Sequence, residues 1–333
     1  MTITTILKTA EARDFLAAIP ALLGFQPSES AVVVPFHGNR TIGAMRFDLP
    51  AIEDAAGMAS AVAGLVCKID NATGVAIVIY GTAEQAEAVG SAIVAQADVC
   101  GLAVIDALYV IGTEWARIGE GTLTALGEVP AHIAALATEA DAQAGAVLPE
   151  VAEAFAAEVA EALPVASART NLSVVVNTFE RALTLDTATV TALDAATLIV
   201  LLDRPLTRDV ALVQWARDRM TGAATLDAQV AFKGTNEIPA HLGEVMVGGG
   251  ARPDADRLRD ALRACRYLAA VAPEAAKVGA LVACGWLSWA LGRSSHAEIY
   301  VRQALAINPD HVMAGLIAQM VNAGHLPEWA FTR

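Results

Sequence analysis

Residues 31–36, AVVVPF, and the tetrapeptide HGNR at 37–40 are followed by TIGAMRFDL at 41–49. The run of β-branched residues favours a buried strand. Gly38 and Asn39 suit the positive φ angles of a tight hairpin turn, so Thr41 to Leu49 is predicted to return as a second strand. This hairpin predicts a β-sheet at the start of the fold.

The chain continues from the hairpin with alternating helical and extended segments. We predict a helix after Pro50 to about 69, a strand at 74–80, a helix from about 83 to 97 and a strand at 102–111. Strands that alternate with helices of this length indicate a mixed α/β layer, to which the hairpin adds antiparallel pairing. Residues 1–128 are therefore predicted to form a mixed-sheet α/β domain.

From Pro130 onward the pattern is helical, with few strand signals. Helices are predicted at 147–163, 187–202, 206–220 and 254–270. Their breaks are expected at Leu163-Pro164, at Arg204-Pro205, in the glycine loop that ends at Pro253 and at Ala272-Pro273. Residues 171–179, NLSVVVNTF, also fit a short strand. The predicted fold class is α/β (α+β), with a helical connection over 129–185 and a helical domain over 186–333.

The chain is acidic and, despite a mean hydropathy of +0.49, contains no segment typical of a membrane protein. Its 333 residues carry 22 basic and 36 acidic side chains, a net charge of −14, which argues against a nucleic-acid partner. The longest uncharged apolar run, Val278 to Leu291, is shorter than the roughly 18 residues of a spanning helix. The first residues lack the pattern of a signal peptide. We therefore expect a cytoplasmic protein with no membrane association.

The cysteines and histidines give no sign of a metal or redox centre. Cys67, Cys100, Cys265 and Cys284 are widely spaced and form no CxxC pair, so we expect small buried side chains that stay reduced. The six histidines are scattered without i, i+4 pairing, which gives no sequence-local metal site. The nucleotide-binding loop, nucleophile-elbow and zinc-protease motifs are all absent. No cofactor and no metal are expected.

Three segments of the chain follow one another in an order that matches a known family. They are LLGFQPSESAVVV (22–34) with MRFDLP (45–50), LDAATLIVLLDRPLTRD (193–209), and the end of the chain from Leu281 to His311, closing with AGHLP at 323–327. On these segments the chain resembles the actinobacterial domain of unknown function 4192. Trp115 is all that corresponds to the family's tryptophan-rich, cysteine-containing stretch. The resemblance implies a fold and an order of elements, and it implies no activity.

Residues 278–311 also resemble a tetratricopeptide unit. Gly285, Ala297, Ala304 and Pro309 stand at the spacing of that repeat's small packing positions and terminal proline. Small residues there let two helices approach closely, and a third helix at about 311–323 would complete the stack. A plain helical hairpin that closes the domain is an equal alternative, because no second full repeat is present.

Arg46 and Asp48 are the leading ligand-binding candidates in the first half. Two residues apart on a strand, they share one face at its end, where α/β sheets tend to bind ligands. The alternative is structural: Arg46 pairs with a carboxylate and Asp48 caps the helix after Pro50. Ser28 and Ser30 in the loop before the first strand, and Thr82 at a strand-to-helix turn, are weaker candidates. Turn chemistry for the serines and an ordinary N-cap for the threonine are the alternatives.

Two groups of charged residues are candidates in the helical half. Arg208 and Asp209, in the first turn of a predicted helix, are expected to form an interdomain pair. Arg259, Arg263 and Arg266 recur on one helix face as a basic stripe for an acidic partner. The alternative for this stripe is a solvated face neutralised by its own aspartates.

Three hypotheses for function follow. The first is a non-enzymatic protein-protein interaction or scaffold protein that binds an unidentified protein through its helical half. The second is a small-ligand-binding protein or enzyme that uses the α/β domain around Arg46 and Asp48. The third is a structural protein that assembles into a homo-oligomer.

Overall fold

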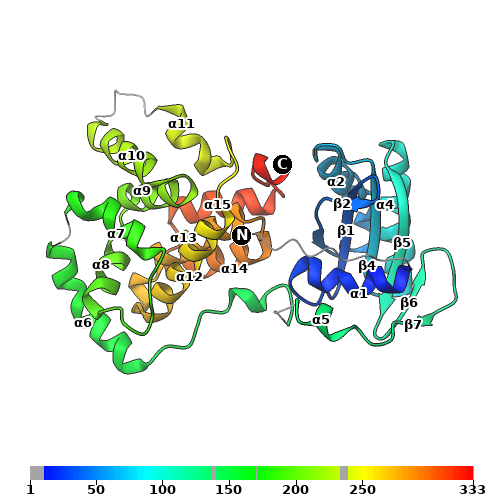
Figure 1. Cartoon of the computed structure of the whole chain (residues 1–333), viewed down its shortest axis with the longest axis horizontal. Helices are drawn as coiled ribbons and strands as arrows, with labels where there is room; N and C mark the ends of the chain where they lie inside the picture. The colour runs from blue at the N-terminus through cyan, green and yellow to red at the C-terminus, as the bar shows by residue number, and fades with distance from the viewer. Residues whose placement is uncertain (1–10, 137–139, 170, 233–238, 333) are drawn as a thin grey trace. The chain divides into compact units, whose positions relative to one another are not determined.

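A mixed sheet and a set of packed helices occupy separate parts of the computed structural model, which describes residues 11–136, 140–169, 171–232 and 239–332 (Figure 1). The contacts divide the chain into two units, Met1–Gly145 and Ala146–Arg333. Residues of the predicted connection fall on both sides of this boundary. The first unit holds the sheet and the second is helical, as the fold class predicts.

The sheet of the first unit has seven strands in the order β2-β1-β4-β5-β6-β7, with β3 also paired to β1. Only β4 and β5 pair in parallel among the described strands. The predicted hairpin is present: Gly38 has a φ of 59° and His37 pairs with Arg40. The return segment is not one strand, because it pairs with β1 as two short pieces, β2 and β3. The strands are β1 (Ser30–His37), β2 (Arg40–Thr41), β3 (Met45–Asp48), β4 (Gly74–Tyr80), β5 (Ala103–Ile111), β6 (Glu114–Arg117) and β7 (Thr124–Ala125).

Helices cover both faces of this sheet (Figure 1). Alternate residues of a strand point to opposite faces, and the central strands are apolar at both sets of positions. Val32, Val34 and Val78 pack with α1 (Ala12–Leu23) on what we call the α1 face. Val33 and Ile77 pack with α2 (Ala55–Cys67) and α4 (Ser91–Val99) on the opposite face. A short α3 (Ala83–Gln85) and a π-helical turn (Ala86–Gly90) lead into α4, and α5 is Ala131–Ala134.

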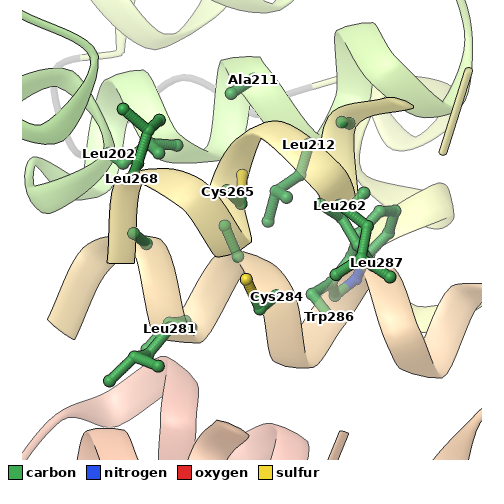
Figure 2. Close-up of a cluster of buried hydrophobic side chains, with 14 of the residues drawn as sticks. Leu202, Ala211, Leu212, Leu262, Cys265, Leu268, Leu281, Cys284, Trp286 and Leu287 are labelled. Atoms are coloured by element: carbon green, nitrogen blue, oxygen red, sulfur yellow. The ribbon is translucent and has the colours of Figure 1, made fainter. Parts of the chain in front are cut away.

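The core of the second unit is built around α13, whose residues are all buried. Side chains of α8, α9, α12 and α13 form one apolar cluster, which includes Cys265 and Cys284 (Figure 2). Two of its tryptophans are anchored by hydrogen bonds, from Trp215 Nε1 to the Phe179 carbonyl and from Trp286 Nε1 to the Met246 carbonyl. The helices are α6 (Glu153–Arg169), α7 (Val175–Ala182), α8 (Ala192–Asp203), α9 (Pro205–Ala216), α10 (Arg219–Ala231), α11 (Ala240–Gly243), α12 (Ala255–Val271), α13 (Val278–Ala290), α14 (Ser294–Ile307) and α15 (Val312–Asn322).

Two local predictions in the helical half were wrong, and one alternative that the sequence left open is excluded. The helix α6 continues through Pro164, because the loss of one backbone donor does not end a helix packed into a core. The segment predicted as one helix at 206–220 is split between α9 and α10, since Asp218 accepts a hydrogen bond from the Thr221 amide and starts a new helix. Residues 172–182 are helical and not a strand, with Val175, Phe179 and Ala182 buried at helical spacing.

Candidate functional site

The first unit contains a pocket of about 710 Å³ beside the start of α1. Its lining includes an ion pair across β5 and β6, in which Arg117 Nε lies 3.1 Å from Asp106 Oδ1 and Nη2 lies 3.3 Å from Oδ2. The hydrogen bond from Arg117 to Asp106 raises the pKa of this arginine. Side chains that line the pocket include Phe15, Phe36, Asn39, Asp106, Trp115 and Arg117.

Trp115 lines this pocket and carries a donor that is not used. Its Nε1 is buried and has no hydrogen-bond partner among the described residues. A buried N–H without a partner is destabilising, and such groups are uncommon in folded proteins. Aromatic walls, a paired charge and a free donor can together hold a flat ligand that carries an acceptor. Asp106 and Arg117 were missed as candidates, although the hairpin of β5 and β6 makes them neighbours, and Trp115 was named only for the family resemblance.

Arg46 and Asp48 pair with each other at the end of β3. Arg46 Nη2 lies 2.5 Å from Asp48 Oδ1, and the Asp48 side chain is 81% exposed. The N-cap position of the 3₁₀ turn after Pro50 belongs to Ala51, so Asp48 does not cap it. Of the two structural roles expected for these residues, the ion pair is therefore the one present.

The sheet also brings Ser30 beside this pair. Ser30 stands in register with Asp48 on one side and Tyr80 on the other, and its hydroxyl is buried without a partner among the described residues. Burial raises the pKa of the Tyr80 phenol. Ser28 lies apart from them, exposed in the preceding loop.

Thr82 forms a reciprocal cap with Gln85 at the start of α3. The Gln85 amide donates to Thr82 Oγ1 at 3.2 Å, and the Thr82 amide donates to Gln85 Oε1 at 2.8 Å. The two backbone amides are thus occupied by side-chain acceptors, whereas an anion at the helix start would need them free. The turn therefore has the N-cap geometry that the sequence offered as the alternative to anion binding.

Arg208 and Asp209 lie in a charged cluster within the helical unit. Arg208 is 5% exposed and donates to Asp209 Oδ1 at 3.2 Å, while its Nη1 lies 3.3 Å from His311 Nε2. Burial raises the pKa of Asp209, against the opposing effect of Arg208. The interdomain role of Arg208 and Asp209 stays a prediction.

His311 in this cluster also caps α15. The Ala314 amide donates to His311 Nδ1 at 3.2 Å. A neutral imidazole has one acceptor nitrogen, so Arg208 and the Ala314 amide compete for it. Burial and then the charge of Arg208 lower the pKa of His311.

The basic stripe on α12 is bound to groups of its own unit. Arg259 pairs with Asp256 at 2.5 Å and Arg263 pairs with Asp260 at 3.0 Å. Arg266 donates to the Val147 carbonyl. The self-paired alternative therefore describes Arg259 and Arg263, whereas Arg266 bonds a backbone carbonyl and no aspartate.

A polar group joins α7 to α12 and was not expected from the sequence. Arg257 donates to both oxygens of Glu180, at 2.8 and 3.1 Å, and to the Gln214 carbonyl at 3.2 Å. The Gln214 amide completes the group with a 2.9 Å hydrogen bond to Glu180. The hydrogen bond from Arg257 lowers the pKa of Glu180.

The outer side of α15 exposes two large apolar side chains together with the uncharged Gln319. Val312 is 76% exposed and Leu316 53%, and α15 contains no charged residue. Met320 follows at the same i, i+4 spacing and is partly buried. We call Val312, Leu316 and Met320 the α15 stripe. The sequence predicted this helix but gave no sign of which side would be exposed.

The expectation that all four cysteines are buried was wrong for two of them. Cys67 and Cys100 are exposed in the first unit, whereas Cys265 and Cys284 are buried in the second. The described residues contain no group of three or more histidine, cysteine or acidic side chains placed to hold a metal ion. Among the same residues, no helix is long and apolar enough to cross a membrane.

A family model described as "Domain of unknown function (DUF4192)" matches residues 13–328, which is nearly the whole chain and includes both units. Searches of curated proteins and of solved structures found no significant match.

Proposed function

The chain belongs to the DUF4192 family, and for this member we propose a non-enzymatic role in protein-protein interaction. In this proposal the helical unit binds an amphipathic helix of a partner protein along the α15 stripe. We place the interaction in the cytoplasm. The observation that carries the proposal is the exposed, uncharged outer side of α15.

The end of the helical unit supports this proposal. Helices α13, α14 and α15 follow one another in the chain and pack against their neighbours. Gly285 of α13 lies against Val301 of α14, and a small residue at such a contact is typical of a tetratricopeptide-like helix pair. Stacks of such helices need a polar outer face on their terminal helix to stay soluble. The α15 stripe has the apolar character of an internal helix, so a further helix from a partner would complete the stack.

The partner helix can be described from its binding surface. It would carry apolar residues at i, i+3 and i+4 spacing, the pattern by which amphipathic helices bind apolar grooves. The net charge of −14 favours basic residues at its edges, because complementary charge speeds association. Burial of Val312 and Leu316 would contribute about 1 to 2 kcal/mol each.

The proposal is tested with the double variant Val312→Glu/Leu316→Glu in the tagged full-length chain. Proteins that copurify from native cells are quantified by mass spectrometry. Met220→Glu is the matched control, because Met220 is 81% exposed on another helix of the same unit. We expect a specific partner to fall about tenfold or more with the double variant and to be retained by the control. Equal recovery with both variants would refute the proposal.

Point variants are better suited to this test than a truncation. Removal of residues 277–333 would take away α13, every residue of which is buried. Loss of binding would then report unfolding of the unit. Self-assembly is tested by light scattering, which gives the molar mass of the wild type and of the double variant. A dimeric wild type and a monomeric variant would mean that the α15 stripe binds a second copy of the chain.

A second candidate function is binding of a small ligand in the pocket of the first unit. Trp115, which lines this pocket together with the Asp106–Arg117 pair and has an unpaired Nε1, favours it. A thermal-shift screen of nucleotides and metabolites would use Asp106→Asn and Asp48→Asn as paired variants. A ligand that no longer stabilises Asp106→Asn but still stabilises Asp48→Asn would support this pocket. A ligand that no longer stabilises only Asp48→Asn would place the site at Arg46 and Asp48. The absence of any stabilising ligand would count against both sites.

A further inference from the structure

Two cysteines of the first unit stand at the ends of helices that contact each other, although they are 33 positions apart in the sequence. Cys67 is the last residue of α2, and Cys100 directly follows the last residue of α4. Both helices pack on the same face of the sheet, and they contact each other. α2 leads into β4 and α4 leads into β5, and because these two strands are parallel, both helices end at the same edge of the sheet. Both cysteines are exposed, and after burial the interaction with the Cys100 thiol also raises the pKa of Cys67.

The surroundings of this pair differ from those of the other two cysteines. Cys265 and Cys284 are fully buried among aliphatic side chains, and burial raises the pKa of both thiols. Thiols without access to solvent and without thiolate character are inert. Only Cys67 and Cys100 therefore combine exposure with a neighbouring thiol in the described part of the chain.

We propose that Cys67 and Cys100 form a reversible intramolecular disulfide with a hydroperoxide as the oxidant. One thiolate attacks the peroxide oxygen; the O–O bond breaks, a sulfenic acid forms, and the released hydroxide takes up a proton as water. The second thiolate then attacks the sulfenic sulfur and displaces a second hydroxide, which is also protonated to water. In sum, two thiols and one hydrogen peroxide give one disulfide and two waters.

The position of the pair determines what the disulfide would change. It would join the end of α2 to the end of α4, and the closed loop includes the central strand β4. Such a crosslink restricts the unfolded chain and so stabilises the native unit. The pKa of Cys67 is raised, mainly by burial. Because its thiolate fraction is therefore small at neutral pH, oxidation is expected to become faster as the pH rises.

The experiment uses the full-length chain, fully reduced and then treated with hydrogen peroxide. Trypsin cleaves after Arg46, Lys68 and Arg117 and so releases Cys67 and Cys100 on separate peptides. We expect a crosslinked pair of the peptides 47–68 and 69–117 under non-reducing conditions, with the loss of two hydrogen atoms from the intact mass. A reductant should restore the starting mass. The melting temperature of the oxidised chain should rise by about 5 °C.

Variants and the buried cysteines provide the controls. Cys67→Ser and Cys100→Ser should each abolish the crosslink and the thermal shift. Cys265 and Cys284 should stay unmodified in the same digest. Independent oxidation of Cys67 and Cys100 to sulfinic acids, a disulfide between two chains, or no reaction at pH 8.5 on the roughly hour timescale of slow thiol chemistry would each overturn the proposal.

Discussion

Replacement of Gly279 by alanine should destabilise the helical unit, although the same change usually stabilises a helix. Gly279 lies in the first turn of α13, where the helix meets the end of α8. A Cβ at this position would lie 2.5 Å from the carbonyl carbon and oxygen of Leu202 and 2.6 Å from the Asp203 nitrogen. All three are backbone atoms, so no side-chain rotation can relieve the overlap.

The size of the effect follows from two opposing contributions. Alanine gains at most about 1 kcal/mol over glycine in a helix. Overpacking of a close-packed interior costs about 1 to 3 kcal/mol, and a backbone contact at 2.5 Å belongs at the upper end. The expected net loss is therefore about 2 kcal/mol. Gly315 on α15 is the matched control, because a Cβ there would meet no atom within 4 Å and alanine should stabilise by up to about 1 kcal/mol.

Urea unfolding followed by tryptophan fluorescence separates these outcomes. Four of the five tryptophans, Trp215, Trp286, Trp289 and Trp329, lie in the helical unit, so the signal reports mainly on it. With a slope of about 2 kcal/mol per molar urea, Gly279→Ala should lower the midpoint by about 1 M and Gly315→Ala should raise it by up to about 0.5 M. If Gly279→Ala raises the midpoint as Gly315→Ala does, the close contact between α13 and α8 is refuted.

Three further perturbations have expected outcomes that the same structure specifies. Because the pKa of His311 is lowered in the folded state, the unfolded state binds a proton first as the pH falls, and the helical unit should lose stability below about pH 6.5. His311→Asn keeps an N-cap and should flatten the pH dependence of the urea midpoint. An unchanged pH dependence in this variant would contradict the prediction. Glu180→Gln leaves the Arg257 guanidinium without its carboxylate and should lower the free energy of unfolding in urea by about 1 to 2 kcal/mol. The control Glu298→Gln, at an exposed ion pair on α14, should lower it by less than about 0.5 kcal/mol. Equal losses in the two variants would show that the link between α7 and α12 adds no stability. Thr82→Ala should lower the stability of the first unit by about 1 kcal/mol in thermal unfolding and Thr82→Ser should restore most of it, whereas wild-type stability in Thr82→Ala would refute the capping role.

Predictions about single elements depended on local patterns and were mostly reliable. The hairpin at Gly38, the strand at 74–80 and the helices at the end of the chain are present close to where the sequence predicts them. The errors at Pro164 and at 206–220 lie at element boundaries, where packing competes with propensity. The uncertainty at 171–179 had another cause, since a short apolar run fits a buried strand and a buried helix equally well.

Candidate sites were harder to predict because their residues come from distant parts of the chain. Arg208 and His311 are 103 positions apart, and neither predicts the other. Asp106 and Arg117 are closer in sequence, but their pairing depends on the register between β5 and β6. Local charge pairs such as Arg46 with Asp48 could be predicted from the sequence, because residues i and i+2 of a strand lie on the same face whatever surrounds them.

The sequence by itself determined the kind and order of the elements: a mixed sheet followed by helices, an acidic surface, and no helix long enough to span a membrane in the described chain. Periodicity and turn chemistry act within a few residues, and these properties depend on nothing more distant. Only the tertiary structure decided that Cys67 and Cys100 are exposed at the ends of two helices in contact, and that Val312 and Leu316 of the α15 stripe are exposed. The reason is physical: periodicity shows that a helix has an apolar side, but which side is buried depends on the helices packed against it.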